Sequence, residues 1–516
     1  MTKPNFYVTT PIYYVNDKPH IGHAYTTIAC DVLARFKRLD GFDVKFLTGT
    51  DEHGQKVMQA AQKANIDPQT FTDQVSVNFR DVLPVINVTN DQFIRTTDPA
   101  HKKAVQAIWQ KMEEAGDIYL SNYGGWYATR DEAFYGEDEI TTGPDGKKYG
   151  PYNVPVEWVE EESYFFKLSA WQDRLLEFYD KNPDFIQPAS RRNEVISFVK
   201  SGLRDLSISR TTFNWGVPVP GNDKHVMYVW VDALTNYISA LGYPDTDAVQ
   251  YKKFWPADVH MVGKDILRFH AVYWPAFLMS AGLELPKMIF AHGWWTVEGQ
   301  KMSKSLGNVV SPQQMVDTYG VDQIRYALLR EVSFGNDGDF SQKSITIRIN
   351  AELANTIGNL CQRTLSQIAK NCEGKVPQAG VLEDADHELL KQCGQDMLLA
   401  VRGEFDRLQF SKAIEVIVQA ANAANIYIDA QAPWTLKKTD TARMQTVLYV
   451  LAEAIRNIAI VLQPFCPDAA GRMLDQLAVA ADARDFAHIG ALHSLKPGIE
   501  LPAPSGVFPR IVEAAA

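Results

Sequence analysis

The sequence predicts an α/β fold: a parallel sheet that is split by an inserted segment and followed by an all-helical domain. Residues 5–51 read as strand, helix and strand, an order that forms parallel sheets. Residues 258–295 repeat this order. From about residue 345 onward, strand patterns disappear and amphipathic helices such as QFSKAIEVIVQAANAANIYID dominate.

Each element of the first unit has its own signal. Aromatic and β-branched side chains alternate over residues 5–15, which predicts a strand. From Tyr25 onward, apolar residues recur at helical spacing, and Gly41 ends the predicted helix. The stretch VKFLTGT is the second strand. Such a Rossmann-like sheet carries its functional groups at the carboxyl ends of its strands.

The middle of the chain breaks this pattern. Residues 118–227 are rich in Gly, Tyr and acidic side chains, which predicts an insertion of short strands and turns. The expected division is residues 1–117 for the first half of the Rossmann-like domain, 118–227 for a connective insertion, 228–344 for the second half and 345–516 for a helical domain.

Composition narrows the class of protein. The chain has 46% hydrophobic and 22% charged residues, as globular proteins do. It contains no apolar run that is long enough to predict a membrane span. No secretion signal is recognisable, so we expect a cytoplasmic protein. Five cysteines without a CxxC pair speak against disulfides and a thiolate zinc site. The net charge of −11 speaks mildly against a nucleic-acid partner, unless basic side chains gather on one face.

Two histidines, His20 and His23, stand where the first strand gives way to the helix, in the stretch PHIGHAY. Unpaired helix N–H groups favour an anion at such a junction, and Gly22 permits close approach of a ligand. The chain has neither a GxxxxGK[ST] nor a GxGxxG loop, so a nucleotide site here is of another kind. Ordinary core or surface histidines are the alternative interpretation.

The stretch GQKMSKSLGN places Lys301 and Lys304 three residues apart, ahead of a helix start that Ser311 is predicted to cap. In isolation, two such lysines are commonly solvated surface charges. Together with the histidines, they supply the cations that a triphosphate and its leaving pyrophosphate require.

The stretches HIGH and KMSKS resemble the two signatures of class I aminoacyl-tRNA synthetases, and their context resembles the methionyl-tRNA synthetase family. The resemblance runs through YVTTPIYYVNDKPHIGHAYTT, FLTGTDEHGQK, YVWVDALTNY, GKDILRFHAVYWPA, HGWWTVEGQKMSKSLGN, QAPW and VFPRI. It implies a ligase that activates methionine with ATP and Mg²⁺ as methionyl-adenylate and transfers the methionyl group to the 3′ end of tRNA(Met). No covalent enzyme intermediate is implied, so catalysis rests on positioning and electrostatics.

The same resemblance assigns residues to ligands, position by position. The residues implied for ATP are His20, Gly22, His23, Gly263, Asp265, Lys301 and Lys304; the two histidines and two lysines are the catalytic ones, and Lys304 is expected to have the larger effect on rate. The residues implied for methionine are Ile12, Tyr14, Asp51, Trp230, Ala233, Leu234, Tyr237, Ile266 and His270. The residues implied for the anticodon, which the helical domain would read, are Asn359, Arg363, Pro433 and Trp434.

Each assignment competes with a plainer one. Asp51 ends a predicted strand, where it can bind the methionine ammonium group or merely cap the next helix. An aromatic stripe is more often core than pocket, although a thioether packs well among rings and accepts a weak hydrogen bond from a Tyr hydroxyl or a His N–H. Trp434, in a predicted loop beside Pro433, is ordinarily a packing residue, but a Trp can also stack on an unpaired base.

The chain departs from many members of that family. The stretch WYATRDEAFYGEDEITTGPDGKKYG has no cysteine, so we expect no structural zinc. No further module is recognisable after VFPRI, which favours a monomer. The insertion of about 110 residues is too short for the editing domain of related synthetases. A pocket discriminates a single methylene by roughly 10–200-fold at most, so homocysteine is expected to compete with methionine.

Three alternative functions stay open on the sequence alone. A small-molecule adenylyltransferase would share the histidine site but would not need a helical anticodon reader. A catalytically silent relative of the synthetases would bind RNA or act as an adaptor. Cysteine specificity is the nearest substrate alternative, although that family selects its thiol with zinc, and the ligands for zinc are missing here.

Overall fold

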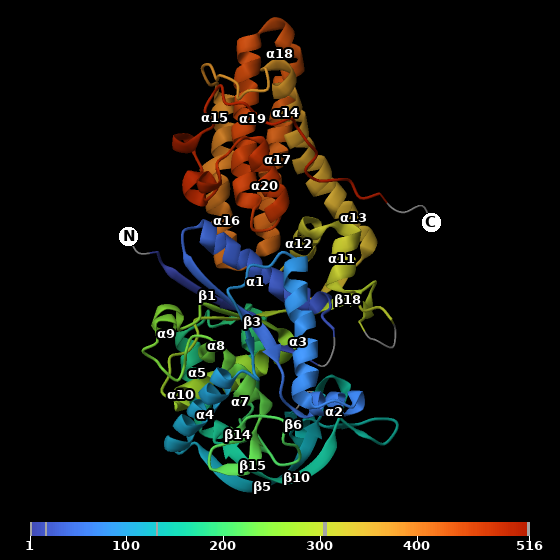
Figure 1. The fold of residues 1–516 in the computed structure, drawn as a ribbon, viewed down its shortest axis with the longest axis vertical. Helices are drawn as coiled ribbons and strands as arrows, with labels where there is room; N and C mark the ends of the chain where they lie inside the picture. The colour runs from blue at the N-terminus through green and yellow to red at the C-terminus, as the bar shows by residue number, and fades with distance from the viewer. Residues whose placement is uncertain (1–2, 16–17, 131–132, 303–306, 513–516) are drawn as a thin grey trace.

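The computed structural model describes residues 3–15, 18–130, 133–302 and 307–512 of the 516-residue chain. The molecule is elongated (Figure 1). The central sheet and its helices lie in the middle, the long strands of the insertion lie at one end, and a helical bundle forms the other end. The predicted catalytic residue Lys304 lies outside the described residues.

A seven-stranded parallel sheet forms the centre, in the order β11-β17-β16-β1-β3-β2, with β4 beside β3. The predicted parallel sheet is confirmed, because β1 pairs with β3 from the first unit and with β16 from the second. The strands are β1 (Asn5–Thr9), β2 (Tyr13–Tyr14), β3 (Asp43–Asp51), β4 (Gln92–Arg95), β11 (Ile186–Gln187), β16 (Val259–Gly263) and β17 (Ile289–His292).

Two boundaries in the first unit differ from the prediction. The strand predicted over residues 5–15 is two strands, because Pro11 has no N–H for a sheet hydrogen bond and the chain leaves the ladder there. Helix α1 (Ile21–Leu39) begins before Tyr25, because His20 acts as its N-cap. The remaining helices around the sheet are α2 (Gln55–Ala64), α3 (Pro68–Val85), α4 (Pro99–Glu114), α7 (Val229–Leu234), α8 (Asn236–Ser239), α9 (Val249–Phe254), α10 (Trp274–Ser280), α11 (Pro312–Tyr319) and α12 (Val321–Arg330).

The insertion is more regular than predicted. Its strands β5 (Ile118–Ala128) and β10 (Glu157–Phe166) are long and form an antiparallel ribbon. The sequence suggested turns here because of its glycines, but Gly124 leaves room for a partner side chain: a Cβ at Gly124 would lie 2.9 Å from Trp158 Cζ2. The segment also contains α5 (Gln172–Lys181) and α6 (Ala189–Lys200), and its strand β11 extends the central sheet.

Helices dominate the last part of the chain, as predicted. They are α13 (Gln342–Arg348), a π-helix (Ile349–Gly358), α14 (Asn359–Asn371), α15 (Asp384–Lys391), α16 (Met397–Asp406), α17 (Phe410–Gln431), α18 (Pro433–Thr439), α19 (Thr441–Leu462) and α20 (Pro467–Gln476). By length and composition, α19 is apolar enough to cross a membrane, but 89% of its most apolar window is buried inside the structure. Its apolar run is therefore explained by its place in the core of the bundle.

One buried arginine joins the sheet to the bundle. Arg325 of α12 donates to Asp31 of α1 at 2.7 Å, and both side chains are fully buried. The same guanidinium donates to the carbonyl oxygens of Pro464 and Phe465, in the turn between α19 and α20. Burial alone would raise the pKa of Asp31, but Arg325 and Arg35 hold it below its ordinary value. Helix α1 and the bundle therefore share one satisfied charge network.

Candidate functional site

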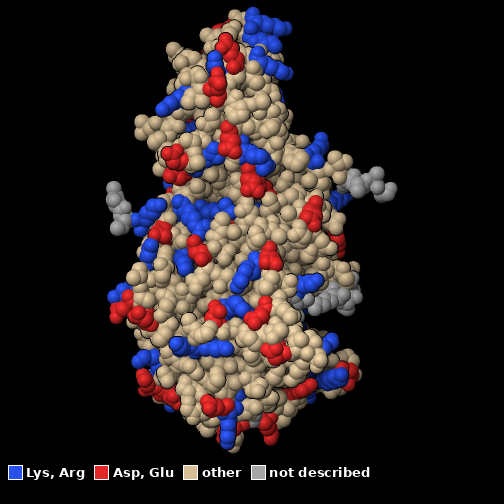
Figure 2. All heavy atoms as spheres, viewed as in Figure 1, with Lys and Arg blue, Asp and Glu red and all other residues tan. Residues whose placement is uncertain are grey.

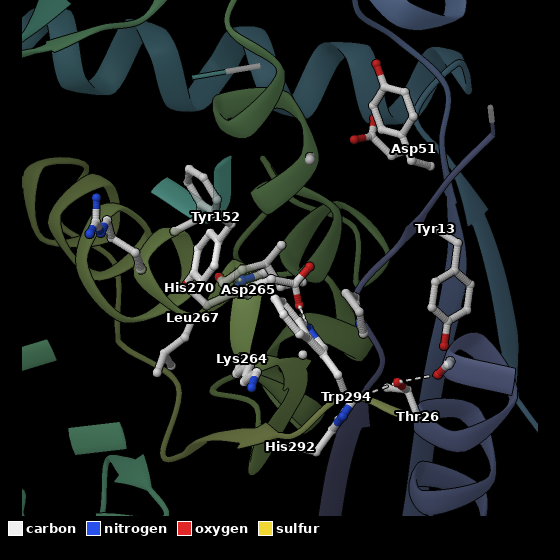
Figure 3. Close-up of a pocket in the computed structure, with 18 of the residues that line it drawn as sticks. Tyr13, Thr26, Asp51, Tyr152, Lys264, Asp265, Leu267, His270, His292 and Trp294 are labelled. Carbon is white, nitrogen blue, oxygen red and sulfur yellow. Dashed lines mark hydrogen bonds between the residues drawn. The ribbon is translucent and has the colours of Figure 1, made fainter. Parts of the chain in front are cut away.

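A cavity of about 800 Å³ opens at the carboxyl ends of the central strands. Its volume lies in the range of small-molecule sites. In the close-up, Asp51 and Tyr152 lie on different sides of the cavity, and Asp265 and Trp294 lie below them, close to one another (Figure 3). The predicted residues that line it are Ile12, Tyr14, His20, Gly22, His23, Asp51, Trp230, Ala233, Leu234, Tyr237, Gly263, Asp265, Ile266, His270 and Lys301.

The histidine pair is held by the backbone at the start of α1. The N–H of Gly22 donates to His20 Nδ1, and the N–H of His20 donates to His23 Nδ1, both at 3.1 Å. Burial and the neighbouring His20 lower the pKa of His23 well below its ordinary value, so this ring is neutral at pH 7. Because each Nδ1 accepts, a neutral ring carries its proton on Nε2, which suits an anionic ligand.

Gly22 is required by this cap. A Cβ on Gly22 would lie 2.9 Å from His20 Cε1, so a larger residue would displace the ring. The start of α1 is also tied to the chain beyond the lysine stretch, since the N–H of Ile21 donates to the carbonyl of Val310 at 3.0 Å. The start of α1 is therefore in contact with the described chain that follows the lysine stretch.

Lys301 is presented by a tight hairpin. Strand β18 (Trp295–Val297) pairs with β19 (Gln300–Lys301), and the two connecting residues, Glu298 and Gly299, have φ of 48° and 75°. Two left-handed residues are typical of the turn that closes a two-residue hairpin. The predicted cap of the next helix is confirmed, because the Ser311 hydroxyl accepts from the N–H of Gln314.

Gly263 and Asp265 lie at the end of β16. The indole N–H of Trp294 donates to Asp265 Oδ1 at 3.2 Å (Figure 3), and Lys264 lies over the same indole ring, 4.4 Å from its centroid. A Cβ at Gly263 would lie 2.6 Å from Asp265 Oδ1, so glycine is what allows this carboxylate to fold back over the strand end.

The apolar side of the cavity contains a linked tyrosine and histidine. His270 Nδ1 is 2.9 Å from the carbonyl of Ile266, so Nδ1 carries a proton and Nε2 accepts from the Tyr237 hydroxyl at 2.6 Å. Burial lowers the pKa of His270 to about 4, so the ring is neutral. The sequence analysis offered a Tyr hydroxyl or a His N–H to a thioether. In this structure, both groups have other partners.

Rings rather than polar atoms therefore shape this side of the cavity. Trp230 stacks on Phe269 with ring centroids 3.8 Å apart. The segment that carries Ile266 and His270 is a 3₁₀ turn followed by a π-helix (Phe269–Tyr273), and not the regular helix predicted, although Ile266, His270 and Tyr273 still face the cavity together.

Asp51 is the last residue of β3, as predicted, and it lines the cavity while its side chain is only 6% exposed. The plainer interpretation was that Asp51 caps the next helix. Helix α2 instead begins after Gly54, without a side-chain cap. The position of Asp51 is therefore consistent with the ligand-binding interpretation.

Sequence reasoning missed several residues that line the cavity. Thr26 Oγ1 lies 2.7 Å from His292 Nε2, which connects α1 to the end of β17 (Figure 3). Tyr152 of the insertion lies edge-on to Trp294 at the mouth, with ring centroids 5.7 Å apart. The only usable signal was that His292 lies in the predicted strand KMIFAHGWW; nothing in the sequence placed Tyr152 near the sheet.

A second candidate site lies on the helical bundle. Asn359 and Arg363 are one turn apart on α14, as predicted. The predicted loop around Pro433 and Trp434 was wrong: both lie in the first turn of α18, and only Ala432, with φ of 43°, separates it from α17. Pro433 fits there because a first-turn N–H has no helical partner to lose.

Arg363 and Trp434 meet in this second site. Arg363 donates to Asp429 at 2.6 Å, and its guanidinium lies 5.5 Å from the Trp434 ring centroid. Both residues line a cavity of about 410 Å³, whereas Asn359 and the buried Pro433 are not among its described lining residues. Figure 2 shows acidic and basic side chains mixed over one face, with a basic group at the tip of the bundle, where α18 carries exposed lysines. The negative net charge thus coexists with local positive charge.

The described residues offer no grouped metal site. No three or more His, Cys, Asp and Glu side chains lie together among them in a way that would hold an ion. All five cysteines are buried free thiols. The expected absence of structural zinc stays a prediction.

Two families match the chain. Residues 6–365 match the family described as tRNA synthetases class I (M), and residues 376–516 match the anticodon binding domain of methionyl tRNA ligase. A methionine–tRNA ligase of Rickettsia felis is 58% identical over 516 residues, which cover 98% of this chain and 99% of the relative. A methionine–tRNA ligase of Brucella suis is 58% identical over 514 residues, which cover 100% and 99%.

Solved structures show the same similarity. The Mycobacterium tuberculosis methionyl-tRNA synthetase in complex with methionyl-adenylate superposes with a TM-score of 0.96 at 53% identity, over 98% of this chain and 100% of that one. The free form of that enzyme gives a TM-score of 0.90 at 49% identity, over 99% of each chain. The similarity therefore covers both the sheet with its cavity and the helical bundle.

Proposed function

The chain belongs to the methionyl-tRNA synthetase family of class I aminoacyl-tRNA synthetases and activates methionine with ATP to charge tRNA, and we propose that the first step takes place in the cavity at the ends of the central strands. One observation carries this location: the backbone-held histidines of α1, Lys301 and an aromatic apolar wall line one cavity of ligand size.

The polar side of the cavity is suited to ATP. His20 and His23 would donate from Nε2 to phosphate oxygens, and Lys301 would approach from the opposite hairpin, with Lys304 as its partner in the reaction. Asp265 would accept from the nucleoside. Mg²⁺ would enter as part of the ATP complex, because this ion is commonly held by phosphate oxygens and water with few protein ligands.

The chemistry needs no covalent enzyme intermediate. A carboxylate oxygen of methionine forms a bond to the α-phosphorus of ATP, while the bond from that phosphorus to the pyrophosphate oxygen breaks. The lysine cations and the imidazole N–H donors would stabilise the charge that builds on the phosphoryl group and on the leaving pyrophosphate. The cap holds the two imidazoles before substrate arrives, so their orientation need not change during the reaction.

The apolar side is suited to the methionine side chain. Asp51 would accept from the ammonium group as a charge-assisted hydrogen bond. The stacked Trp230 and the neutral Tyr237–His270 pair would pack against the thioether, which is polarizable and favours ring contacts. Ile12, Tyr14, Ala233, Leu234 and Ile266 complete the proposed wall.

The bundle would read the anticodon. Trp434 is 37% exposed beside Arg363, so an unpaired base can stack on the indole while the guanidinium bonds to a base edge. We assign a second base contact to Asn359, which lies on α14 with Arg363. We assign to Pro433 the role of fixing the first turn of α18, which presents Trp434.

ATP–pyrophosphate exchange, measured separately with each of the twenty amino acids and with homocysteine, tests this function. Methionine should support exchange, homocysteine should support it roughly 10–200-fold less efficiently, and cysteine should not support it. Exchange with cysteine but not methionine would overturn the substrate assignment, and no exchange with any amino acid would favour a catalytically silent protein.

Further expectations belong to the same proposal. We propose a monomeric cytoplasmic protein without structural zinc, divided at residues 117, 227 and 344 as the sequence predicted. Sedimentation at micromolar concentration should give a mass near the 57.9 kDa of one chain. Elemental analysis of the purified protein should show no stoichiometric zinc.

A further inference from the structure

A buried cluster of two histidines and one aspartate lies beside the apolar side of the cavity. Asp232 of α7 is 1% exposed; His53 Nδ1 lies 2.6 Å from one of its carboxylate oxygens and His101 Nε2 lies 2.8 Å from the other. Both histidines are also buried. None of the three side chains lines the cavity, so the proposed chemistry does not use them.

The first histidine connects the cluster to the end of β3. His53 follows Asp51 by two residues, and its carbonyl accepts from the Tyr14 hydroxyl at 3.0 Å. Its ring also lies edge-on to Trp215, 5.3 Å away, whose indole N–H donates to the carbonyl of Glu52. The chain directly after Asp51 is therefore fixed at Glu52 and at His53.

The aspartate and the second histidine connect the cluster to two short helices. Asp232 lies between Trp230 and Ala233 on α7, and both of those residues line the cavity. His101 comes from α4, and its Nδ1 lies 2.7 Å from the hydroxyl oxygen of Ser239, the last residue of α8. Each of these helices has fewer than two full turns, so propensity alone would not hold it in place.

The chemistry of the cluster requires a carboxylate at position 232. Burial alone would raise the pKa of Asp232, but His53 and His101 outweigh it and hold the pKa well below its ordinary value. A charged carboxylate accepts on both oxygens. An asparagine of the same shape accepts on one side only and turns an N–H₂ group toward the other imidazole, where it competes for the hydrogen-bonding position.

We propose that His53, Asp232 and His101 are positioning residues that set the methionine side of the cavity by holding α7 and α8 against the end of β3. The inference rests on the proposed function and deepens it, because it separates the two substrates. The cluster acts on segments that carry Asp51 and Trp230, whereas the ATP side depends on the cap of α1 and on the β18–β19 hairpin.

The test is exchange kinetics of Asp232→Asn, with KM measured separately for methionine and for ATP. The KM for methionine should rise by about tenfold or more, because a hydrogen bond to a charged group is lost and the wall shifts. The KM for ATP should stay unchanged. The matched control is Asp322→Asn: Asp322 is also buried, but it accepts from the N–H groups of Asp468 and Ala469 at the start of α20 and does not line the cavity.

Two further variants decide the question if Asp232→Asn does not fold. His101→Gln keeps a donor toward Asp232 and should retain most of the affinity for methionine, whereas His101→Leu should lose it. Where Asp232→Asn folds, histidine-selective NMR gives a second readout: the strongly downfield ring N–H protons of the wild type should be absent in this variant.

Each outcome has one meaning. An equal rise of both KM values, or a methionine effect in Asp322→Asn of the same size, would overturn the positioning role, and so would His101→Leu behaving like His101→Gln. A wild type that exchanges with methionine while Asp232→Asn keeps its KM values overturns this inference alone. A wild type that does not exchange with methionine overturns the proposed function instead.

Discussion

The cavity in the sheet and the site on the bundle are built in opposite ways. The cavity collects side chains from distant parts of the sequence, and many of them are held by the backbone, as His20 and His23 are by N–H groups. The bundle site uses adjacent turns of α14, α17 and α18. There Arg363 is held by Asp429, which is itself 62% exposed, and by the partly exposed Trp434.

This difference matches what the two sites are proposed to do. Transition-state stabilisation needs donors that are oriented before reaction, since reorientation would cost free energy at the moment of bond formation. Recognition of a single-stranded loop instead tolerates and uses side chains that adjust to unstacked bases. The two regions are therefore expected to respond differently to the loss of one contact.

The largest effect is expected where the two regions are joined. Arg325→Met should lower the free energy of unfolding at neutral pH by about 3–5 kcal/mol, because it removes one of the two cations paired with the buried Asp31 carboxylate and leaves the buried carbonyl oxygens of Pro464 and Phe465 without this donor. Chemical denaturation measures this change. Arg402→Met, which breaks a partly exposed pair with Asp40 across the same junction, should cost about 1 kcal/mol or less.

The stability difference between wild type and Arg325→Met should also depend on pH. Because the folded-state pKa of Asp31 is lowered, the ion pair contributes stability that is fully present above the unfolded-state pKa of about 4 and is lost as pH falls through the folded-state value. The difference between wild type and Arg325→Met should therefore narrow in acid. A gap that widens in acid would mean that Asp31 is not the charge that Arg325 stabilises.

A loss confined to chemistry comes next. Lys301→Ala should lower the exchange kcat by an amount that corresponds to about 3 kcal/mol of transition-state stabilisation, with Lys304→Ala lower still, because each removes a cation proposed to meet the phosphates. Single-turnover formation of the adenylate measures it. The control is Lys343→Ala on α13, since Lys343 does not line the cavity. Unchanged kcat in Lys301→Ala would remove this lysine from the proposed set.

The sequence predicted the cavity better than the bundle site, and the reason is physical. Residues such as Asp51 and Gly263 end strands, and parallel strands bring their carboxyl ends to one edge whatever the details of packing. Pro433 and Trp434 were predicted to lie in a loop, whereas a proline is also favourable in a first helical turn. Only the left-handed Ala432 distinguishes the two cases.

Contacts between side chains were beyond the sequence. His270 accepts from the Tyr237 hydroxyl and donates to the carbonyl of Ile266. Both hydrogen bonds depend on a π-helix that no spacing rule indicates. Tyr152 reaches Trp294 from an insertion whose glycines suggested turns. His53 meets Asp232 from 179 positions later in the chain, and the same carboxylate meets His101 from 131 positions earlier. Such pairs follow from tertiary packing, which local patterns do not encode.

A smaller loss of activity, limited to the use of tRNA, is expected at the bundle site. Trp434→Ala should reduce kcat/KM for tRNA by an amount that corresponds to about 1–3 kcal/mol, because one stacked base loses its platform. ATP–pyrophosphate exchange should be unchanged, since the residue lies outside the cavity. Leu399→Ala, at an exposed position on α16, is the matched surface control. Equal damage to exchange and charging would make Trp434 a structural residue.

The smallest effects compare one substitution at two helix glycines. Gly403→Ala in α16 should raise the free energy of unfolding by about 0.5–1 kcal/mol, because no atom lies within 4 Å of the new Cβ and alanine loses less backbone entropy in a helix. Gly22→Ala should lower it by about 1 kcal/mol, since the new Cβ would displace His20 from the cap of α1. Thermal unfolding measures both, and exchange with ATP as the varied substrate should report a higher KM for Gly22→Ala alone. If Gly22→Ala raised the free energy of unfolding as Gly403→Ala is expected to do, the cap of α1 would not depend on its glycine.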